Sequence, residues 1–335
     1  MQVRELVRLR SAARGLLYAA SAMLAVAALG AVSPAWPGQS LWVANNQSIN
    51  LEQFKHSQLK ETGLPRPNLI GLSSAPLGIS FDRKGNLWTT TGGTQVQEIT
   101  AKQLAKLEKK STPTPAVTIT SSSFQSLVGS NFDPAGNLWI ADASGAIYQL
   151  SAAQLKAGSA DLTPAITLTA SGDFDSPQFV AFDKAGDLWV SDQAASAVFE
   201  FTPDQLAAGG NQAPRVITAG LASPGQLAFD HKKNLWVANF DNSTVVEYSK
   251  ADLASTTNPA PAIAITSPNN TLKGAFGVAF DVSGDLWVAN FTTGAILKFG
   301  PVQLTNPNSQ RPKIFLGSAN NFSYQITFGP TSGSN

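Results

Sequence analysis

Short hydrophobic runs separated by polar, glycine-bearing turns follow one another along most of the chain. One such unit begins with the apolar residues 277–280, continues through a polar turn at residues 281–285, and returns as a second apolar run at residues 286–289. Gly284 stands where the turn needs a positive φ, and Asp281 can accept hydrogen bonds from backbone N–H groups two residues later. Two apolar runs joined by such a turn predict a β-hairpin.

The same hairpin recurs, and each copy carries a tryptophan in its second apolar run. The spacing between successive tryptophans is 46 to 51 residues, and they stand at Trp42, Trp88, Trp139, Trp189, Trp236 and Trp287. Self-similarity at this period predicts a repeat array. A large aromatic side chain on a strand that is covered on both faces would fill the gap between neighbouring units, and its burial removes roughly 150–250 Å² from water.

Each unit contains further elements after the hairpin. A third strand is predicted by alternating segments such as residues 197–201, and a fourth by segments such as residues 165–168. Between them, three units carry Ser/Thr-x-x-Gln, a capping-box pattern that predicts a single helical turn. Four antiparallel strands in each of six units predict an all-β fold, the six-bladed β-propeller.

The two ends of the chain complete one unit between them. The first unit begins at its second strand, residues 41–45, whereas residues 325–329 align with the first strand of the other units and have no tryptophan strand after them. We therefore expect the last strand to pair with residues 41–45 and to close the ring. Closure leaves no free strand edge between the two ends of the chain. The predicted propeller covers residues 36–335.

Residues 1–35 differ in kind from the rest. Four arginines precede 17 apolar residues at positions 16–32, and small residues follow. This order predicts a secretory signal peptide cleaved after Ala35, with Ala31 as the alternative site. A retained single-pass anchor is the other interpretation, because 17 residues are close to the shortest spanning length. Both interpretations place the propeller outside the cytoplasm, secreted or periplasmic, and a chain without cysteine is unaffected by an oxidising compartment.

Composition excludes some partners. The formal net charge is +1, and only 13% of the residues are charged. Because no basic stripe is visible, we expect no nucleic-acid partner. We also expect no membrane contact by the propeller beyond an N-terminal anchor.

One unit makes a family resemblance visible. Residues 224–230 read Pro-Gly-Gln-Leu-Ala-Phe-Asp, and residues 234–239 read Asn-Leu-Trp-Val-Ala-Asn. Together they resemble the core of NHL-type repeats, and the likeness extends over residues 41–329. The resemblance implies a six-bladed propeller related in fold to the SMP-30/gluconolactonase-like and streptogramin (virginiamycin B) lyase-like groups. In those enzymes the face where the second strands end carries metal and substrate.

On that face, short amides and carboxylates end the second strands of five units. They are Asn45, Asp142, Asp192, Asn239 and Asn290. Such a ring could bind a ligand or one divalent ion, Ca²⁺ or Mg²⁺, through oxygen atoms, with Asp142 and Asp192 as the charged metal ligands. In the structural interpretation each residue caps its own strand end by accepting from loop N–H groups. Recurrence in most units favours the structural role, which predicts that Asp and Asn are interchangeable here within roughly 0.5 kcal/mol.

The histidines weigh against catalysis. Both of them, His56 and His231, are predicted on the opposite face, so no Ser-His-Asp set can form and we assign no catalytic residue. The leading hypothesis is a non-catalytic binding or scaffold propeller without cofactor, for a protein or carbohydrate ligand. The alternative is a metal-dependent lactonase-like hydrolase or lyase with its site at the mouth of the central channel.

Overall fold

The computed structural model describes residues 38–107, 110–170, 174–266, 271–305, 311–317 and 323–330. The predicted signal peptide, its two cleavage sites and the possible anchor lie outside these residues. Within the described part of the chain, no helix has both the length and the apolar character needed to cross a membrane.

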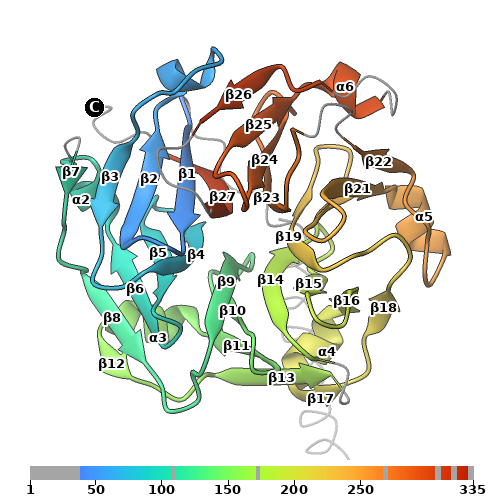
Figure 1. The fold of residues 1–335 in the computed structure, drawn as a ribbon. Helices are drawn as coiled ribbons and strands as arrows, with labels where there is room; N and C mark the ends of the chain where they lie inside the picture. Colours follow the sequence, from blue (N-terminus) through green and yellow to red (C-terminus); the bar gives the residue numbers. More distant parts are fainter. Residues whose placement is uncertain are drawn as a thin grey trace, which may run out of the picture.

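Six sheets surround a central axis in the described residues, as Figure 1 shows. The innermost strands of blades 1 to 6 are β27 (Ser323–Gly329), β4 (Pro76–Phe81), β9 (Leu127–Phe132), β14 (Pro177–Phe182), β19 (Pro224–Phe229) and β23 (Ala275–Phe280). The second strands are β1 (Ser40–Asn45), β5 (Leu87–Thr91), β10 (Leu138–Asp142), β15 (Leu188–Asp192), β20 (Leu235–Asn239) and β24 (Leu286–Asn290). The six-bladed all-β fold predicted from the repeat is confirmed.

The outer half of each blade holds two more strands. The third strands are β2 (Asn50–Phe54), β6 (Gln95–Ile99), β11 (Ala146–Leu150), β16 (Ala197–Phe201), β21 (Thr244–Tyr248) and β25 (Ile296–Phe299). The fourth strands are β3 (Asn68–Gly71), β8 (Val117–Thr120), β13 (Ile166–Ala170), β18 (Arg215–Ile217), β22 (Ile263–Ile265) and β26 (Ile314–Leu316). All four strands of a blade pair antiparallel in sequence order, except that blade 1 takes its innermost strand from the C-terminus.

The ring closes in the way predicted from the sequences at the two ends of the chain. Strand β27 pairs antiparallel with β1, and the register places Leu41 opposite Phe328 and Val43 opposite Ile326. In Figure 1 the red β27 therefore lies beside the blue β1. The first blade combines the two ends of the chain, so separating the blades requires breaking a sheet.

Linkers reach back to the preceding blade and cover its outer edge, which the sequence did not predict. Three of them add a short parallel fifth strand: β7 (Lys110–Ser111) pairs with β3, β12 (Ala160–Asp161) with β8, and β17 (Gly210–Gln212) with β13. At blade 4 a side chain takes this place, because the side-chain Oδ1 of Asn258 accepts from the N–H groups of Thr218 and Ala219. The covered edges are the ones most open to pairing with other chains.

A short helical segment follows the third strand of every blade. The segments are η1 (His56–Leu59), α2 (Ala101–Leu104), α3 (Ala152–Ala157), α4 (Pro203–Ala208), α5 (Lys250–Ser255) and α6 (Pro301–Thr305). Thr100, Ser151 and Thr202 form complete capping boxes with the glutamine three residues later. The Ser/Thr-x-x-Gln pattern thus begins a helical turn where it was expected.

The six repeat tryptophans lie between blades, each no more than 3% exposed. Each indole packs edge-on against a phenylalanine at or next to the end of the first strand of the next blade, with ring centroids 5.6 to 6.3 Å apart. The last of these contacts, Trp287 with Phe328, uses the C-terminal strand. Aromatic pairs of this geometry add to the stability gained from burial alone.

Candidate functional site

The five polar residues predicted at the channel mouth do end the second strands, but they are buried. Their exposed fractions are 0% or 1%. Asp142 uses both carboxylate oxygens on backbone N–H groups: Oδ2 accepts from Gln125 and Oδ1 from Ser126, over 2.9 and 3.1 Å. Its Oδ1 also accepts from the N–H and hydroxyl of Ser144. The carboxylate therefore ties together two loops of its own blade.

Asp192 repeats this arrangement in blade 4. It accepts from the N–H groups of Asp175, Ser176 and Ala195 over 2.9 to 3.0 Å. Burial raises the pKa of this carboxyl, and the three backbone donors oppose that rise. Its oxygens are occupied by groups within the blade, so binding a divalent ion would require these hydrogen bonds to break.

The asparagines make a different pattern, which leads us to expect that Asp and Asn are not interchangeable at these positions. In blade 5 the Asn239 amide accepts from Ala222 N–H and donates to the Gly220 carbonyl. In blade 6 Asn290 likewise accepts from Lys273 N–H and donates to the Thr271 carbonyl. The aspartates face only donors, whereas each of these asparagines faces a donor and at least one acceptor, because the Asn239 amide also donates to Thr244 Oγ1. Each loop is therefore matched to its own residue.

A serine of the preceding blade completes the asparagine pattern. In blades 3 and 4 the aspartate accepts from a second loop N–H, and in blades 5 and 6 a serine takes over that contact. The Ser223 N–H of blade 5 donates to Ser196 Oγ of blade 4, and the Gly274 N–H of blade 6 donates to Ser243 Oγ of blade 5. Both serines adopt positive φ, at 48° and 54°. The Asn45 amide oxygen, in blade 1, accepts from Gln47 N–H. The hydrogen bonds described for Asp142, Asp192, Asn239 and Asn290 join each one to its own blade and do not bring them together around an ion.

Aromatic rings occupy the channel next to these strand ends. Phe179 of blade 4 lies 5.6 Å from Phe276 of blade 6 and 5.6 Å from Tyr324 of blade 1, and Phe276 lies 4.5 Å from Tyr324, measured between ring centroids. The Tyr324 hydroxyl donates to Gln178 over 2.8 Å. Blades 1 and 4 face each other across the ring, so this cluster, called the aromatic plug below, spans the channel.

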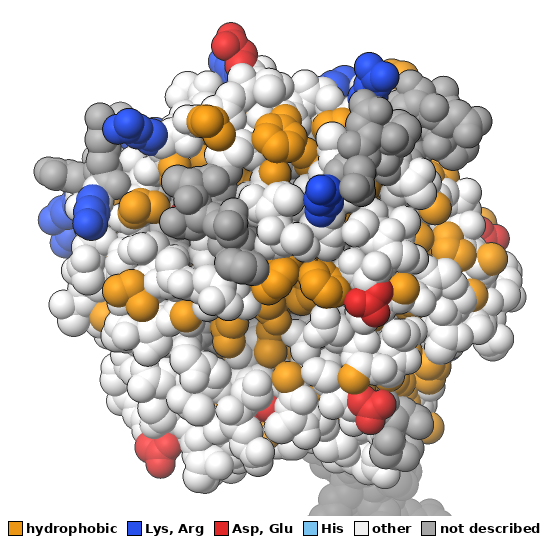
Figure 2. Space-filling view, viewed as in Figure 1, with side chains coloured by type: hydrophobic (Ala, Val, Ile, Leu, Met, Phe, Trp, Pro, Cys, Tyr) orange, Lys and Arg blue, Asp and Glu red, His pale blue; other side chains and the backbone are white. Residues whose placement is uncertain are grey.

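Glycines make room for the plug. A Cβ atom at Gly129 would collide with the Phe179 ring, and one at Gly225 would meet the backbone and ring of Phe276. Phe240 and Phe291 extend the plug outward. In Figure 2, which looks along the ring axis, hydrophobic side chains gather near the centre and charged side chains are few and scattered. These aromatics interrupt the repeat instead of following it, so the repeat pattern did not predict them.

The other end of the channel holds a cavity of about 400 Å³. Its walls come from the first strands and hairpin turns of the blades, and His231 lies there with Asp183 and Lys184. His56 begins η1 at the outer side of blade 1. No group of three or more His, Cys, Asp or Glu side chains arranged to hold a metal occurs among the described residues.

Comparisons with known proteins identify the fold. No family model and no curated protein sequence matches the chain. A chain in a crystal structure of a nidogen/laminin complex is 14% identical with a TM-score of 0.61, covering 88% of this chain and 100% of that one. A Bacteroides caccae protein of unknown function is 12% identical with a TM-score of 0.60, covering 88% and 99%. A streptogramin B lyase structure is 15% identical with a TM-score of 0.50, covering 81% and 72%.

These likenesses and the strand topology define the class of protein. The chain is a six-bladed β-propeller, similar in fold to the chain of the nidogen/laminin complex and to the streptogramin B lyase structure. Within that class it carries a helical segment after the third strand of each blade and an aromatic plug at one end of its channel.

Proposed function

We propose that this protein is an exported, non-catalytic propeller that serves as a binding or scaffold module. The observation that carries this proposal is the occupied channel end. Where the resemblance to lyase- and lactonase-type propellers places metal and substrate, this chain has the aromatic plug, together with carboxylates whose oxygens accept backbone N–H groups. An active site would need these polar and apolar groups to bind substrate, whereas here both features use them to stabilise the fold.

The partner class follows from the surface. A face on which charged side chains are few suits a protein partner better than an ionic one, because interface centres are depleted of charge. The likeness to a chain of a nidogen/laminin complex supports a protein partner, since that propeller was crystallised in a protein complex. A carbohydrate ligand is the second choice.

Export is part of the proposal. The basic and apolar leader at residues 1–35 would direct the chain out of the cytoplasm, and cleavage after Ala35 would release a propeller beginning at Trp36. N-terminal sequencing of the exported protein reports whether cleavage occurs there, after Ala31, or not at all.

The first prediction separates this function from the alternative, a metal-dependent hydrolase or lyase. We expect the melting temperature of the wild-type protein to be the same with 5 mM EDTA as with roughly 5 mM Ca²⁺ or Mg²⁺, because an ion that binds only the folded state would raise it. In the double variant Asp142→Asn and Asp192→Asn, the free energy of unfolding should fall by roughly 1–2 kcal/mol per site, because an amide N–H₂ would face a backbone N–H. The melting temperature should fall with it.

The matched control reverses the change. Asn239→Asp and Asn290→Asp should also lower stability, because a carboxylate oxygen would then face the carbonyl of Gly220 or Thr271. Neither pair of variants should alter the response to ions. A wild-type rise of several degrees with Ca²⁺ that disappears only in the Asp→Asn pair would contradict the proposal and favour the enzyme.

A further inference from the structure

Two blades of the ring place a cation of their own against the repeat tryptophan. In blade 4 the Arg215 guanidinium carbon lies 5.2 Å from the centroid of the Trp189 ring, and its Nε lies 2.6 Å from Glu200. In blade 6 the Lys298 ammonium lies 5.1 Å from the Trp287 centroid. Its Nζ is 2.6 Å from Asp285 and 3.3 Å from Asp281. The slot beside the tryptophan is thus a cation site in two of the six blades.

Blade 2 has the aromatic and anionic parts of this slot but lacks the cation. Glu98 pairs with Trp88 across the sheet just as Glu200 pairs with Trp189. On the fourth strand, however, Val117 stands opposite Glu98, where blade 4 has Arg215 opposite Glu200. Neither position that supplies a cation in the other two blades does so here.

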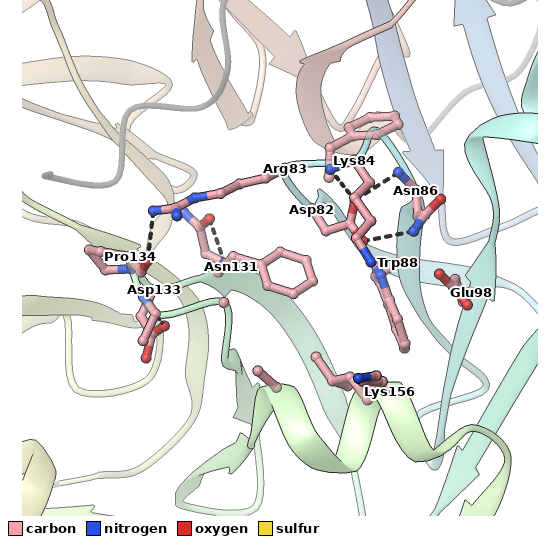
Figure 3. A pocket seen from close by; sticks show the side chains of 16 residues that line it. Asp82, Arg83, Lys84, Asn86, Trp88, Glu98, Asn131, Asp133, Pro134 and Lys156 are labelled. Atoms are coloured by element: carbon pink, nitrogen blue, oxygen red, sulfur yellow. Dashed lines mark hydrogen bonds between the residues drawn. The ribbon is translucent and has the colours of Figure 1, made fainter. Parts of the chain in front are cut away.

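The slot in blade 2 is also open. A cavity of about 390 Å³ lies between blades 2 and 3, and Trp88, Glu98 and Asp82 line it. Figure 3 shows Trp88 and Glu98 at the same side of this pocket, with Lys156 of α3 nearby. The Trp88 side chain is 3% exposed and its indole N–H has no hydrogen-bond partner in the described residues. The Trp189 indole N–H likewise has no hydrogen-bond partner in the described part of the chain, although Arg215 lies over that ring, so the two slots match in this respect.

The cations already at the pocket do not fill the slot. Arg83 donates to the Pro134 carbonyl over 2.6 Å and is committed there. Lys84 and Lys156 line the pocket with their side chains exposed to solvent, and no cation lies over the Trp88 ring in the described residues. Burial and the neighbouring Asp82 raise the pKa of the half-buried Glu98 carboxyl, whereas Lys84 opposes the rise. A cation placed beside this half-buried carboxylate would favour its ionised form.

We propose that the pocket between blades 2 and 3 binds an organic cation, a guanidinium or primary ammonium group, placed over the Trp88 ring and against Glu98. The geometry would repeat the one that Arg215 and Lys298 adopt in their own blades. The cation can come from an arginine or lysine side chain of a protein partner or from a free alkylguanidine or diamine. The site lies between two blades and does not include the aromatic plug, so it does not rest on the function proposed above.

The test uses the full-length propeller with ¹⁵N-labelled indoles and follows the Trp88 N–H resonance, assigned by its loss in Trp88→Phe. Two probes are titrated separately: agmatine, and the capped peptide Gly-Gly-Arg-Gly-Gly. The same peptide with neutral citrulline in place of arginine is the ligand control. We expect a saturable shift of the Trp88 resonance with a cationic probe and none with the citrulline peptide.

Variants locate the binding. Glu98→Gln should weaken binding about tenfold, because a charged partner is lost while the shape is kept. Glu61→Gln, an exposed site on blade 1, makes the same change in net charge and should leave affinity within about twofold. Val117→Arg puts a guanidinium at the Arg215 position and should abolish the probe-dependent shift by occupying the slot.

The relative affinities of the two probes distinguish a protein partner from a free small molecule as the source of the cation. Tighter binding of the peptide than of agmatine assigns the cation to a protein partner, and the reverse assigns it to a free small molecule. Lys156→Met is titrated in parallel, so that a lysine of the pocket itself cannot hide the site. If neither probe shifts the Trp88 resonance in the wild type or in Lys156→Met, or if Glu98→Gln and Glu61→Gln bind equally well, the proposal is wrong.

Discussion

At the scale of single residues, blade 4 has several partly buried charged side chains close together. Glu200 and Asp187 lie beside Trp189 and Arg215, and Asp183 faces Asp187. Burial is the largest influence and raises the pKa of Glu200 to about 7, although Arg215 opposes the rise. Burial, followed by the charge of Asp183, raises the pKa of Asp187 to about 6. The short ion pair with Arg215 therefore does not compensate the loss of hydration.

The second prediction is a pH dependence of stability. The pKa of Glu200 rises from 4.5 to about 7 on folding, so between these values the folded state holds a proton that the unfolded state has lost. This contribution is fully present below about pH 4.5 and is lost as the pH rises through 7, amounting to roughly 1–3 kcal/mol. Glu200→Gln should flatten the fall in unfolding free energy between pH 5 and 8, measured by urea denaturation.

The control for that measurement is Glu61→Gln, which removes a carboxylate at an exposed site. Its pH profile should run parallel to that of the wild type. Absolute stability of Glu200→Gln can fall because Arg215 loses its partner, so the slope with pH is the quantity that decides. Equal slopes in the wild type and in Glu200→Gln would show that another group is responsible.

At the scale of elements, one glutamine fixes both ends of the segment after the third strand in blades 2, 3 and 4. In blade 3 Gln154 Oε1 accepts from Ser151 N–H, which completes the capping box of α3, and its Nε2 donates to the Thr163 carbonyl over 2.8 Å. Gln103 and Gln205 make the same pair of contacts in blades 2 and 4. The side chain starts the helical turn and also holds the linker that returns to the fourth strand.

This double role leads to the third prediction. Glutamate is as good as glutamine in an ordinary capping box, but it has no amide donor for the linker carbonyl. Gln154→Glu should therefore lower the free energy of unfolding by roughly 1–2 kcal/mol, because a carboxylate oxygen would face the Thr163 carbonyl. Equilibrium denaturation checks this.

Ser249 provides an internal control, since its partner is already an acid. Asp252 N–H donates to Ser249 Oγ, and the Ser249 hydroxyl donates to the Asp252 carboxylate. Asp252→Asn in blade 5 should change stability less than Gln154→Glu does. Unchanged stability in Gln154→Glu would mean that the contact with the linker contributes nothing.

Elements were predictable from the sequence where a local signal exists. The hairpins follow from turns such as 281–285, and the helical turns follow from Ser/Thr-x-x-Gln, because both depend on side chains within a few residues. The parallel strands β7, β12 and β17 have only two or three residues each and no periodicity. They form because the linker of one blade reaches the edge of its neighbour, a relation between blades that no local pattern records.

The site was less predictable for the same reason. The positions of Asp142 and Asn239 were clear from the repeat, but whether each side chain faces a donor or a carbonyl depends on a loop 16 to 19 residues earlier. The aromatic plug depends on rings from opposite blades, with Gly129 vacating the space for Phe179. An alignment of the third strands shows which residue stands opposite the repeat tryptophan in each blade. Lys298 is the cation at this position, whereas other blades have Glu98, Gln149, Glu200 and Glu247. This difference is the sequence signal that could have pointed to the pocket in blade 2.

At the scale of the whole molecule, cross-blade contacts make the ring one cooperative unit. Gln226 of blade 5 accepts from the N–H groups of Val278 in blade 6 and Ile326 in blade 1, and Gln325 of blade 1 accepts from Ile79 in blade 2. Tyr324 belongs to the aromatic plug and Phe328 covers Trp287. The C-terminal strand therefore takes part in the sheet, the channel and the packing between blades at once.

If the C-terminal strand closes the ring, a chain without that strand should lose cooperative unfolding. A chain ending at Asn320 lacks β27, and thermal unfolding followed by near-ultraviolet circular dichroism compares it with the full chain. A chain ending at Pro330 keeps all of β27 and is the matched control. We predict that the Pro330 chain melts within about 1 °C of the full chain, because it keeps every strand contact described here. The Asn320 chain should lose its cooperative transition, and a transition at the wild-type temperature in that chain would contradict the account.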